Sequence, residues 1–140
     1  MSVKLFLNFL YPYQPLFRPK PFIKKILSLK KANQGIYAFT FLNNPELKKM
    51  NKTFLQHHYN TDVISFNLGD VETPEADIYI SVDQAQKNAK KEGHSLDDEI
   101  KLLIVHGILH TLGYTDDTPD KKKEMDQEQN RLINLSEIPS

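Results

Sequence analysis

Apolar positions in the first half of the chain switch between a two-residue and a helical period, and each switch marks an expected element. A loose alternation of β-prone residues over 3–9 predicts a first strand. After a proline-rich loop, apolar positions from Pro21 to Leu29 recur at helical spacing among lysines, which predicts an amphipathic helix. Aromatic and β-branched residues over 36–42 predict a second strand, and Asn44-Pro45 begins a helical segment to about residue 56.

Two more strands and three more helices are expected in the second half. Residues 63–68 form a short β run, and residues 76–82 alternate apolar and polar side chains. Asp83 is the expected cap of a polar helix to about residue 92. Ser95 begins the most apolar helix of the chain, and Thr118-Pro119 begins the last one.

This order of elements predicts an α+β fold, a single compact domain over residues 1–140. We expect a small sheet of about four strands, with helices packed around a central buried helix. With 39% apolar and 26% charged residues the composition argues against disorder, and no apolar run approaches the ~18 residues of a membrane span. The first 15 residues lack a signal-peptide pattern and there is no cysteine, so we expect a cytoplasmic protein without disulfides.

Charges are segregated along the chain, although their sum is zero. Residues 1–60 carry ten Lys and Arg and a single acid, Glu46, whereas residues 61–140 carry eight Lys and Arg and seventeen acids. A basic half can bind a polyanion such as RNA locally, with the lysines of residues 18–31 and 48–52 as candidates. Attraction between the two halves of the fold explains the same pattern, so charge alone leaves both interpretations open.

Candidate chemistry is concentrated in the apolar helix and the turn that follows it. His106 and His110 stand four residues apart, and residues at this spacing share one helix face with Cβ atoms ~5–6 Å apart. Gly113 then offers a left-handed helix stop, and the chain returns through Asp116 and Asp117. Two imidazoles and a carboxylate, with a fourth position open, are a ligand set that a catalytic Zn²⁺ uses. We therefore predict a metal site of His106, His110 and Asp116.

Two other interpretations of this helix compete with the metal site. A buried histidine pair can be structural, because an unpaired buried polar group costs ~1–3 kcal/mol and must find partners. The spacing is similar to the zinc-protease motif HExxH, but Gly107 stands where that motif has its general base, which argues against a peptidase. A glycine inside a helix also indicates that another group approaches the backbone closely there.

Several motifs together resemble those of the YbeY family. The run His106–Tyr114 is similar to that family's H-G-x-L-H-x-x-G-Y signature, and 61–66 (TDVISF) and 76–81 (ADIYIS) are similar to two of its strands. Met125 with Glu128 resembles its closing helix. The resemblance implies a zinc-dependent, single-strand-specific endoribonuclease that acts in 16S rRNA maturation and ribosome quality control through a metal-activated water. It also implies RNA, the small ribosomal subunit and assembly factors as partners.

The chain departs from the family pattern at two positions. Asp116 stands where the family usually has a third histidine, and a carboxylate is a competent but harder ligand, so the set suits other divalent transition metals as well as zinc. Leu55 stands where the family usually has an arginine, and His57 or His58 are the nearest candidates for a replacement charge. The missing arginine favours an alternative, a non-catalytic ribosome-assembly or RNA-binding factor with a structural metal. Asp117 either accepts a hydrogen bond from a metal ligand or is a solvated turn residue, and we favour the second interpretation.

Overall fold

The computed structural model describes residues 2–55 and 62–137, with side chains described for 3–50 and 62–137. In this part of the chain the elements follow in the order β1 (Ser2–Phe9), α1 (Pro19–Leu29), β2 (Gln34–Leu42), α2 (Asn44–Leu55), β3 (Val63–Asn67), β4 (Glu75–Ser81), α3 (Val82–Glu92), α4 (Leu96–Thr111) and α5 (Pro119–Ser136). The predicted α+β class and the expected four strands are confirmed. None of the described helices is long and apolar enough to cross a bilayer.

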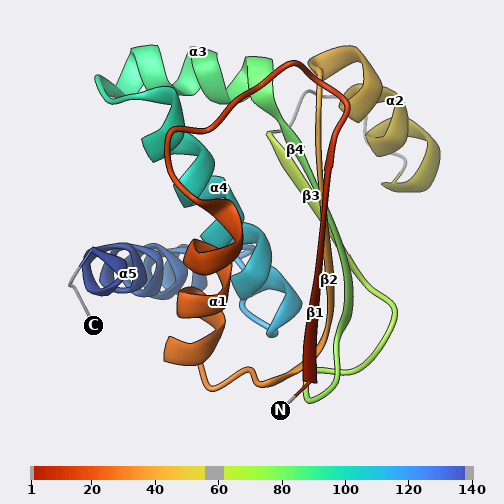
Figure 1. Cartoon of the computed structure of the whole chain (residues 1–140), viewed down its shortest axis with the longest axis vertical. Coiled ribbons are helices and arrows are strands. Elements are labelled where there is room, and N and C mark those ends of the chain that lie inside the picture. Colours follow the sequence, from red (N-terminus) through yellow and green to blue (C-terminus); the bar gives the residue numbers. More distant parts are fainter. Residues whose placement is uncertain (1, 56–61, 138–140) are drawn as a thin grey trace.

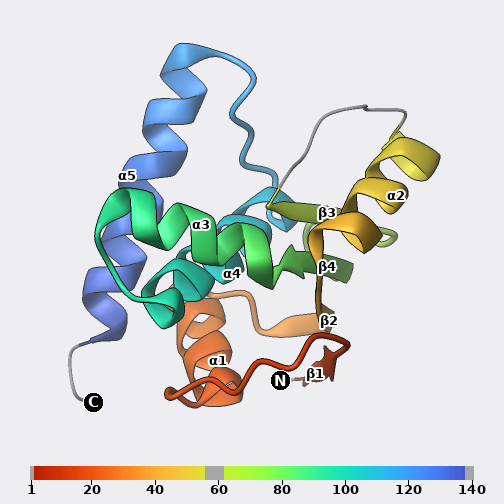
Figure 2. The same ribbon diagram turned by 90° about the horizontal axis from the view of Figure 1, so that it is seen from above.

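The four strands form one open sheet in the order β1-β2-β4-β3, seen from above in Figure 2. β1 pairs parallel to β2, and β2 pairs parallel to β4, so the chain must return to the same end of the sheet between them. Helix α1 makes this return after β1, and α2 followed by the antiparallel strand β3 makes it after β2. β3 pairs antiparallel to β4 and forms the other edge, with Ile64 opposite Tyr79.

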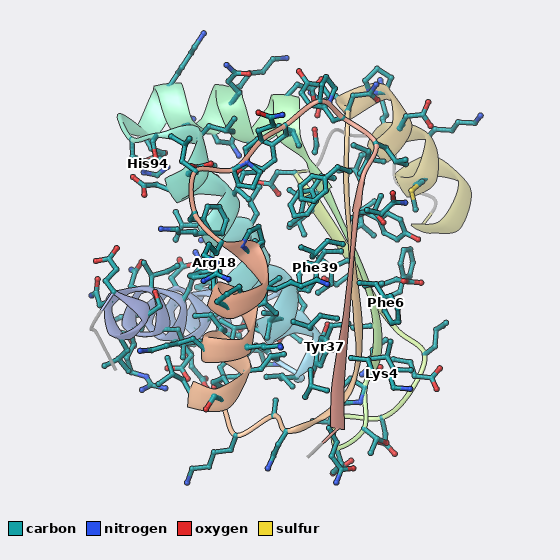
Figure 3. The ribbon with its side chains drawn as sticks, in the orientation of Figure 1. Lys4, Phe6, Arg18, Tyr37, Phe39 and His94 are labelled. Carbon is teal, nitrogen blue, oxygen red and sulfur yellow. The ribbon has the colours of Figure 1, made fainter. Side chains whose placement is uncertain are left out.

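Helices α1, α4 and α5 lie on one face of the sheet, α3 crosses its end, and α2 lies on the opposite face (Figure 1). The larger core fills the first side. Alternation along β2 explains it, because Tyr37, Phe39 and Phe41 are all buried in this core. Figure 3 shows Tyr37 and Phe39 pointing toward these helices. On the neighbouring strand β1, Lys4 and Phe6 point to the other face, where Phe6 is 56% exposed.

Helix α4 runs through the middle of this core and begins and ends as expected. Ser95 is its N-cap and accepts a hydrogen bond from the backbone N–H of Asp98 at 3.0 Å. At the other end Gly113 has φ +101°, and its N–H donates to the His110 carbonyl at 3.1 Å while that of Tyr114 donates to the Leu109 carbonyl at 3.0 Å. These two bonds form a Schellman motif, which turns the chain sharply out of the helix.

Gly107 lets α4 lie directly on the sheet. A Cβ atom at this position would stand 2.7 Å from Ile78 Cγ2 and 3.2 Å from Ser65 Oγ. Ser65 Oγ also donates to the Gly107 carbonyl at 3.2 Å. The close approach expected from this glycine is therefore an approach of β3 and β4, which sets how near α4 stands to the sheet.

The structure corrects two expected helix starts. α1 begins at Pro19 rather than Pro21, because both prolines fall in the first turn, where N–H groups have no helical partner and proline loses nothing. The cap of α3 is Ser81 rather than Asp83: Ser81 Oγ accepts from the backbone N–H of Gln84 at 3.2 Å. Asp83 instead accepts from the backbone N–H of Asn44 at 2.7 Å and so ties α3 to the start of α2.

Candidate metal centre

His106 and His110 converge as their spacing predicts. Both belong to the last turns of α4, and their Nε2 atoms lie 3.0 Å apart with the rings at 80° to each other. Their side chains are 23% and 30% exposed, so the two nitrogens are reached from solvent although most of the helix is buried. This combination of a buried helix and two accessible ring nitrogens suits a ligand-binding site more than a core contact.

The other ring nitrogen of each histidine meets a carbonyl oxygen. His110 Nδ1 donates to the backbone carbonyl of Tyr114 at 3.1 Å, and His106 Nδ1 donates to Gln129 Oε1 at 3.2 Å. A carbonyl oxygen can only accept, so each Nδ1 carries the proton and each Nε2 presents a lone pair. Two lone pairs facing each other at 3.0 Å repel unless a proton or a cation stands between them.

Asp116 completes the group from the loop between α4 and α5. Its Oδ2 lies 3.8 Å from His106 Nε2 and 3.9 Å from His110 Nε2, and the three ligand atoms all lie within 4.8 Å of one another. Ligands at ~2.0–2.2 Å from a tetrahedral ion are separated by roughly 3.3–3.6 Å. The donor set and its spacing therefore fit a single small cation, and the group could hold a metal ion.

Asp117 lies outside this group, although it is the next residue. Its side chain is 68% exposed, and its Oδ1 accepts from Thr115 Oγ1 at 3.0 Å and stands 3.8 Å from Lys121 Nζ. The Thr115 hydrogen bond and the Lys121 charge lower the pKa of its carboxyl group. Asp117 thus has the position of the solvated turn residue that we expected.

Electrostatics favour the neutral form of His106, which is the form that binds metal. Burial lowers the pKa of His106, and the neighbouring His110 lowers it further. The carboxylates of Asp62 and Asp116 and the Gln129 contact act in the opposite direction without reversing the shift. A metal at this position therefore does not have to displace a proton from His106 near neutral pH.

Tyr114 fixes the loop that carries Asp116. Its backbone closes the end of α4 and accepts from His110, and its hydroxyl accepts from Lys30 Nζ of α1 at 2.7 Å. Lys30 also forms an ion pair of 2.5 Å with Glu128 of α5. Because α1, α4 and α5 all hold this one tyrosine, the turn between His110 and Asp116 is anchored on three sides.

The sequence alone indicates the three candidate ligands but not the residues that orient them. Gln129 lies on the same face of α5 as Met125 and Leu132, which are 1% and 0% exposed. A polar residue on this apolar face was the signal for a buried partner. Leu55 is the last residue of α2, and its side chain, like His57 and His58, lies outside what the structure describes.

The comparisons with known proteins agree with one another. A family model described as endoribonuclease YbeY matches residues 18–137. Endoribonuclease YbeY of Bacillus licheniformis is 40% identical, with 80% of this chain and 82% of the relative covered. The protein of the same name from Helicobacter pylori is 36% identical, with 84% and 82% covered.

One solved structure supports the fold alone. The solution structure of TM1509 from Thermotoga maritima is 20% identical, with a TM-score of 0.65, and covers 96% of this chain and 89% of its own. The family match, by contrast, extends from the cap of α1 to the end of α5 and includes every ligand candidate. The chain therefore belongs to the endoribonuclease YbeY family.

Proposed function

We propose that this chain is a single-strand-specific endoribonuclease that acts in 16S rRNA maturation and ribosome quality control in the cytoplasm. In this proposal residues 1–140 form one metal-dependent hydrolase domain, with Zn²⁺ at His106, His110 and Asp116. The observation that carries it is the convergence of three accessible ligand atoms in a chain whose relatives are named endoribonucleases.

The protein's own groups would prepare the site before substrate arrives. Gln129 and the Tyr114 carbonyl hold the Nδ1 protons of the two histidines, which keeps both Nε2 lone pairs directed at the same point. Asp116 adds negative charge from the exposed side. When bound, Zn²⁺ supplies a Lewis acid and lowers the pKa of its water toward ~7.

The proposed substrate class follows from what the site lacks as well as from what it holds. Gly107 is packed against Ile78 and Ser65, so the position that carries the general base in HExxH peptidases has no side chain and no room for one. A phosphodiester needs charge stabilisation at its phosphate oxygens and a deprotonated nucleophile, which a metal site can supply without that base. This supports a nuclease rather than a peptidase.

Turnover on purified RNA tests the proposal. A single-stranded oligonucleotide should be cut, and a duplex of the same sequence should be cut more slowly. Chelator or His106→Ala should abolish cutting, and added Zn²⁺ should restore it only in the chelated wild type. A protein that binds RNA and metal but cuts nothing would instead be the alternative assembly factor with a structural metal.

Partners and metal are proposed together with the activity. Precursor rRNA is the expected substrate, and the small ribosomal subunit with its assembly factors is the expected setting. Asp116 makes the ligand set harder than three histidines, so another divalent transition metal could replace zinc. Metal analysis of protein purified without added metal, and co-sedimentation with small subunits, test these two points.

A further inference from the structure

Three adjoining hollows form a trough along the surface, from the metal loop to the end of α1. The inner hollow, of about 320 Å³, is lined by residues 112–115, which lead directly into Asp116, and by the first turns of α5. The middle hollow, of about 500 Å³, shares Leu112 and Tyr114 with the inner one. The outer hollow, of about 740 Å³, shares residues 31–33 with the middle one. Because neighbours share lining residues, the three hollows adjoin one another in a row.

The outer end of the trough is basic. Lys24 of α1 and Lys31, which follows the C-cap of that helix, both line the outer hollow. Among the described residues no acid lines this hollow, and Lys24 and Lys31 have no carboxylate partner. Lys30 differs, because its charge is already paired with Glu128.

The rest of the trough is close to neutral and partly apolar. Lys30, Lys31 and Glu72 line the middle hollow, and Lys121 and Glu124 line the inner one. Leu112 and Tyr114 line both of these hollows and so bring an aliphatic side chain and an aromatic ring to the place where the two meet. A nucleic-acid base can stack on an aromatic ring, as bases do in single-strand-binding proteins.

Lys31 occupies a backbone position that favours glycine. It follows the C-cap of α1 with φ +56°, and its N–H and that of Ala32 donate to the carbonyls of Ser28 and Leu27 at 3.0 and 2.8 Å. This is the same helix stop that Gly113 makes at the end of α4, but here the residue carries a Cβ atom and bears the strain of the left-handed region. The strained residue, Lys31, is therefore one of the two lysines proposed below to contact RNA.

We propose that the trough binds the part of a single-stranded RNA that flanks the cleaved bond, with Lys24 and Lys31 contacting backbone phosphates. The inference rests on the proposed function and assigns a path to its substrate. Charge complementarity selects the occupant, because two lysines without carboxylate partners in the outer hollow, and the Tyr114 ring between the middle and inner hollows, match a chain of phosphates and bases. A free anion would need only the outer hollow.

Binding of labelled single-stranded RNA across a salt series tests the path. Lys24→Ala/Lys31→Ala should bind about tenfold more weakly at physiological salt, and its salt slope should fall by about 1.4, at roughly 0.7 per lost phosphate contact. The matched control is Lys87→Ala/Lys90→Ala, which removes the same charge from exposed positions of α3. A control that loses as much affinity as the test variant, or a test variant with an unchanged slope, would overturn the proposal.

RNA length adds a second, independent readout. Oligonucleotides extended stepwise on the 5′ or the 3′ side of the cleavage site should gain affinity for the wild type on one side only. The Lys24→Ala/Lys31→Ala variant should lose that gain, with KM raised and kcat unchanged. If inorganic phosphate competes as well as RNA does, the outer hollow is an anion site and the path is wrong.

Lys31→Gly separates charge from folding at one position. The glycine relieves the left-handed backbone, so the melting temperature should rise, while the loss of one phosphate contact should weaken RNA binding and lower the slope by about 0.7. Unchanged RNA binding in this more stable variant would remove Lys31 from the path.

Failure of the path and failure of the proposed function can be told apart. If wild-type protein cuts RNA and the lysine variants bind and cut normally, only the path is wrong. If wild-type protein cuts no RNA, the proposed activity is wrong, whereas the lysine dependence of binding still decides the path.

Discussion

At the scale of single residues, Gln129 decides which nitrogen of His106 faces the metal position. It accepts the Nδ1 proton from a neighbouring helix, at 3.2 Å, and leaves Nε2 free. Gln129→Leu should weaken metal binding by 10–100-fold, the usual effect of losing such a partner, while Gln129→Glu keeps an acceptor and should retain it. Competition titration with a chromogenic chelator measures this directly.

Gln127→Leu is the matched control, because Gln127 is exposed on the same helix and faces away from the site. If Gln127→Leu and Gln129→Leu lose metal affinity equally, α5 as a whole, rather than the Gln129 acceptor, supports the histidines.

Asp116 is the second residue whose identity can be tested by substitution. Asp116→His should retain metal binding, because imidazole is an equally good ligand at this position, whereas Asp116→Ala should bind far more weakly. Asp117→Ala should bind like wild type, since its carboxylate faces Thr115 and Lys121. Metal titration of the three variants measures this, and a strong loss in Asp117→Ala alone would move the third ligand one residue along.

At the scale of elements, Gly107 sets the distance between α4 and the sheet. Helix propensity alone favours alanine over a mid-helix glycine by ~1 kcal/mol. A Cβ atom only 2.7 Å from Ile78 Cγ2, in a buried side chain that cannot swing away, is an overpacking cost of ~1–3 kcal/mol. Gly107→Ala should therefore lower the free energy of unfolding measured in urea. An increase would show that Ile78 and Ser65 move aside at little cost in free energy.

The Lys30–Glu128 anchor between α1 and α5 predicts a pH dependence. The Arg131 hydrogen bond, followed by Lys30, lowers the pKa of Glu128 from 4.5 to about 2 against the effect of burial. A lowered folded-state pKa means that the stabilisation is complete above the unfolded value and is lost as pH falls through the folded one. The difference in unfolding free energy between wild type and Glu128→Gln should thus narrow from pH 6 to pH 3.

Glu124→Gln, an exposed acid on the same helix, is the control and should change little at either pH. If the difference in unfolding free energy between wild type and Glu128→Gln stays constant down to pH 3, packing rather than the charge of Glu128 supports the anchor.

Local signals predict the elements and ligands well, because they depend on neighbours in sequence. The spacing of His106 and His110 and the stop at Gly113 need only the geometry of one helix. The partner of His106 Nδ1 could not be predicted in the same way, since Gln129 comes from a helix whose docking the spacing does not specify. Asp83 illustrates the same limit. Its carboxylate is a suitable N-cap for α3, but it accepts a hydrogen bond from the backbone N–H of Asn44 at the start of α2.

At the scale of the whole molecule, the sheet order shows what sequence patterns leave open. Alternation in β2 and β4 predicts which side chains are buried, but the insertion of β4 between β2 and β3 depends on long-range pairing. The placement of α2 on the face opposite α4 also depends on this order, because its buried Leu47 packs with Leu42 and Ile64. The sequence therefore predicts the fold class, whereas the order of the strands is known only from the structure.

Metal removal should change the stability of the whole domain. The ligands come from α4 and from the loop that leads into α5, so only the folded chain brings them together. A metal that binds the folded state alone adds about 2.7 kcal/mol at a hundred times its Kd, which for a chain of this length raises the Tm by roughly 10 °C. Calorimetry with zinc and with chelator should show this shift in wild type and not in His106→Ala. An equal shift in both proteins would mean that the stabilising ion binds elsewhere.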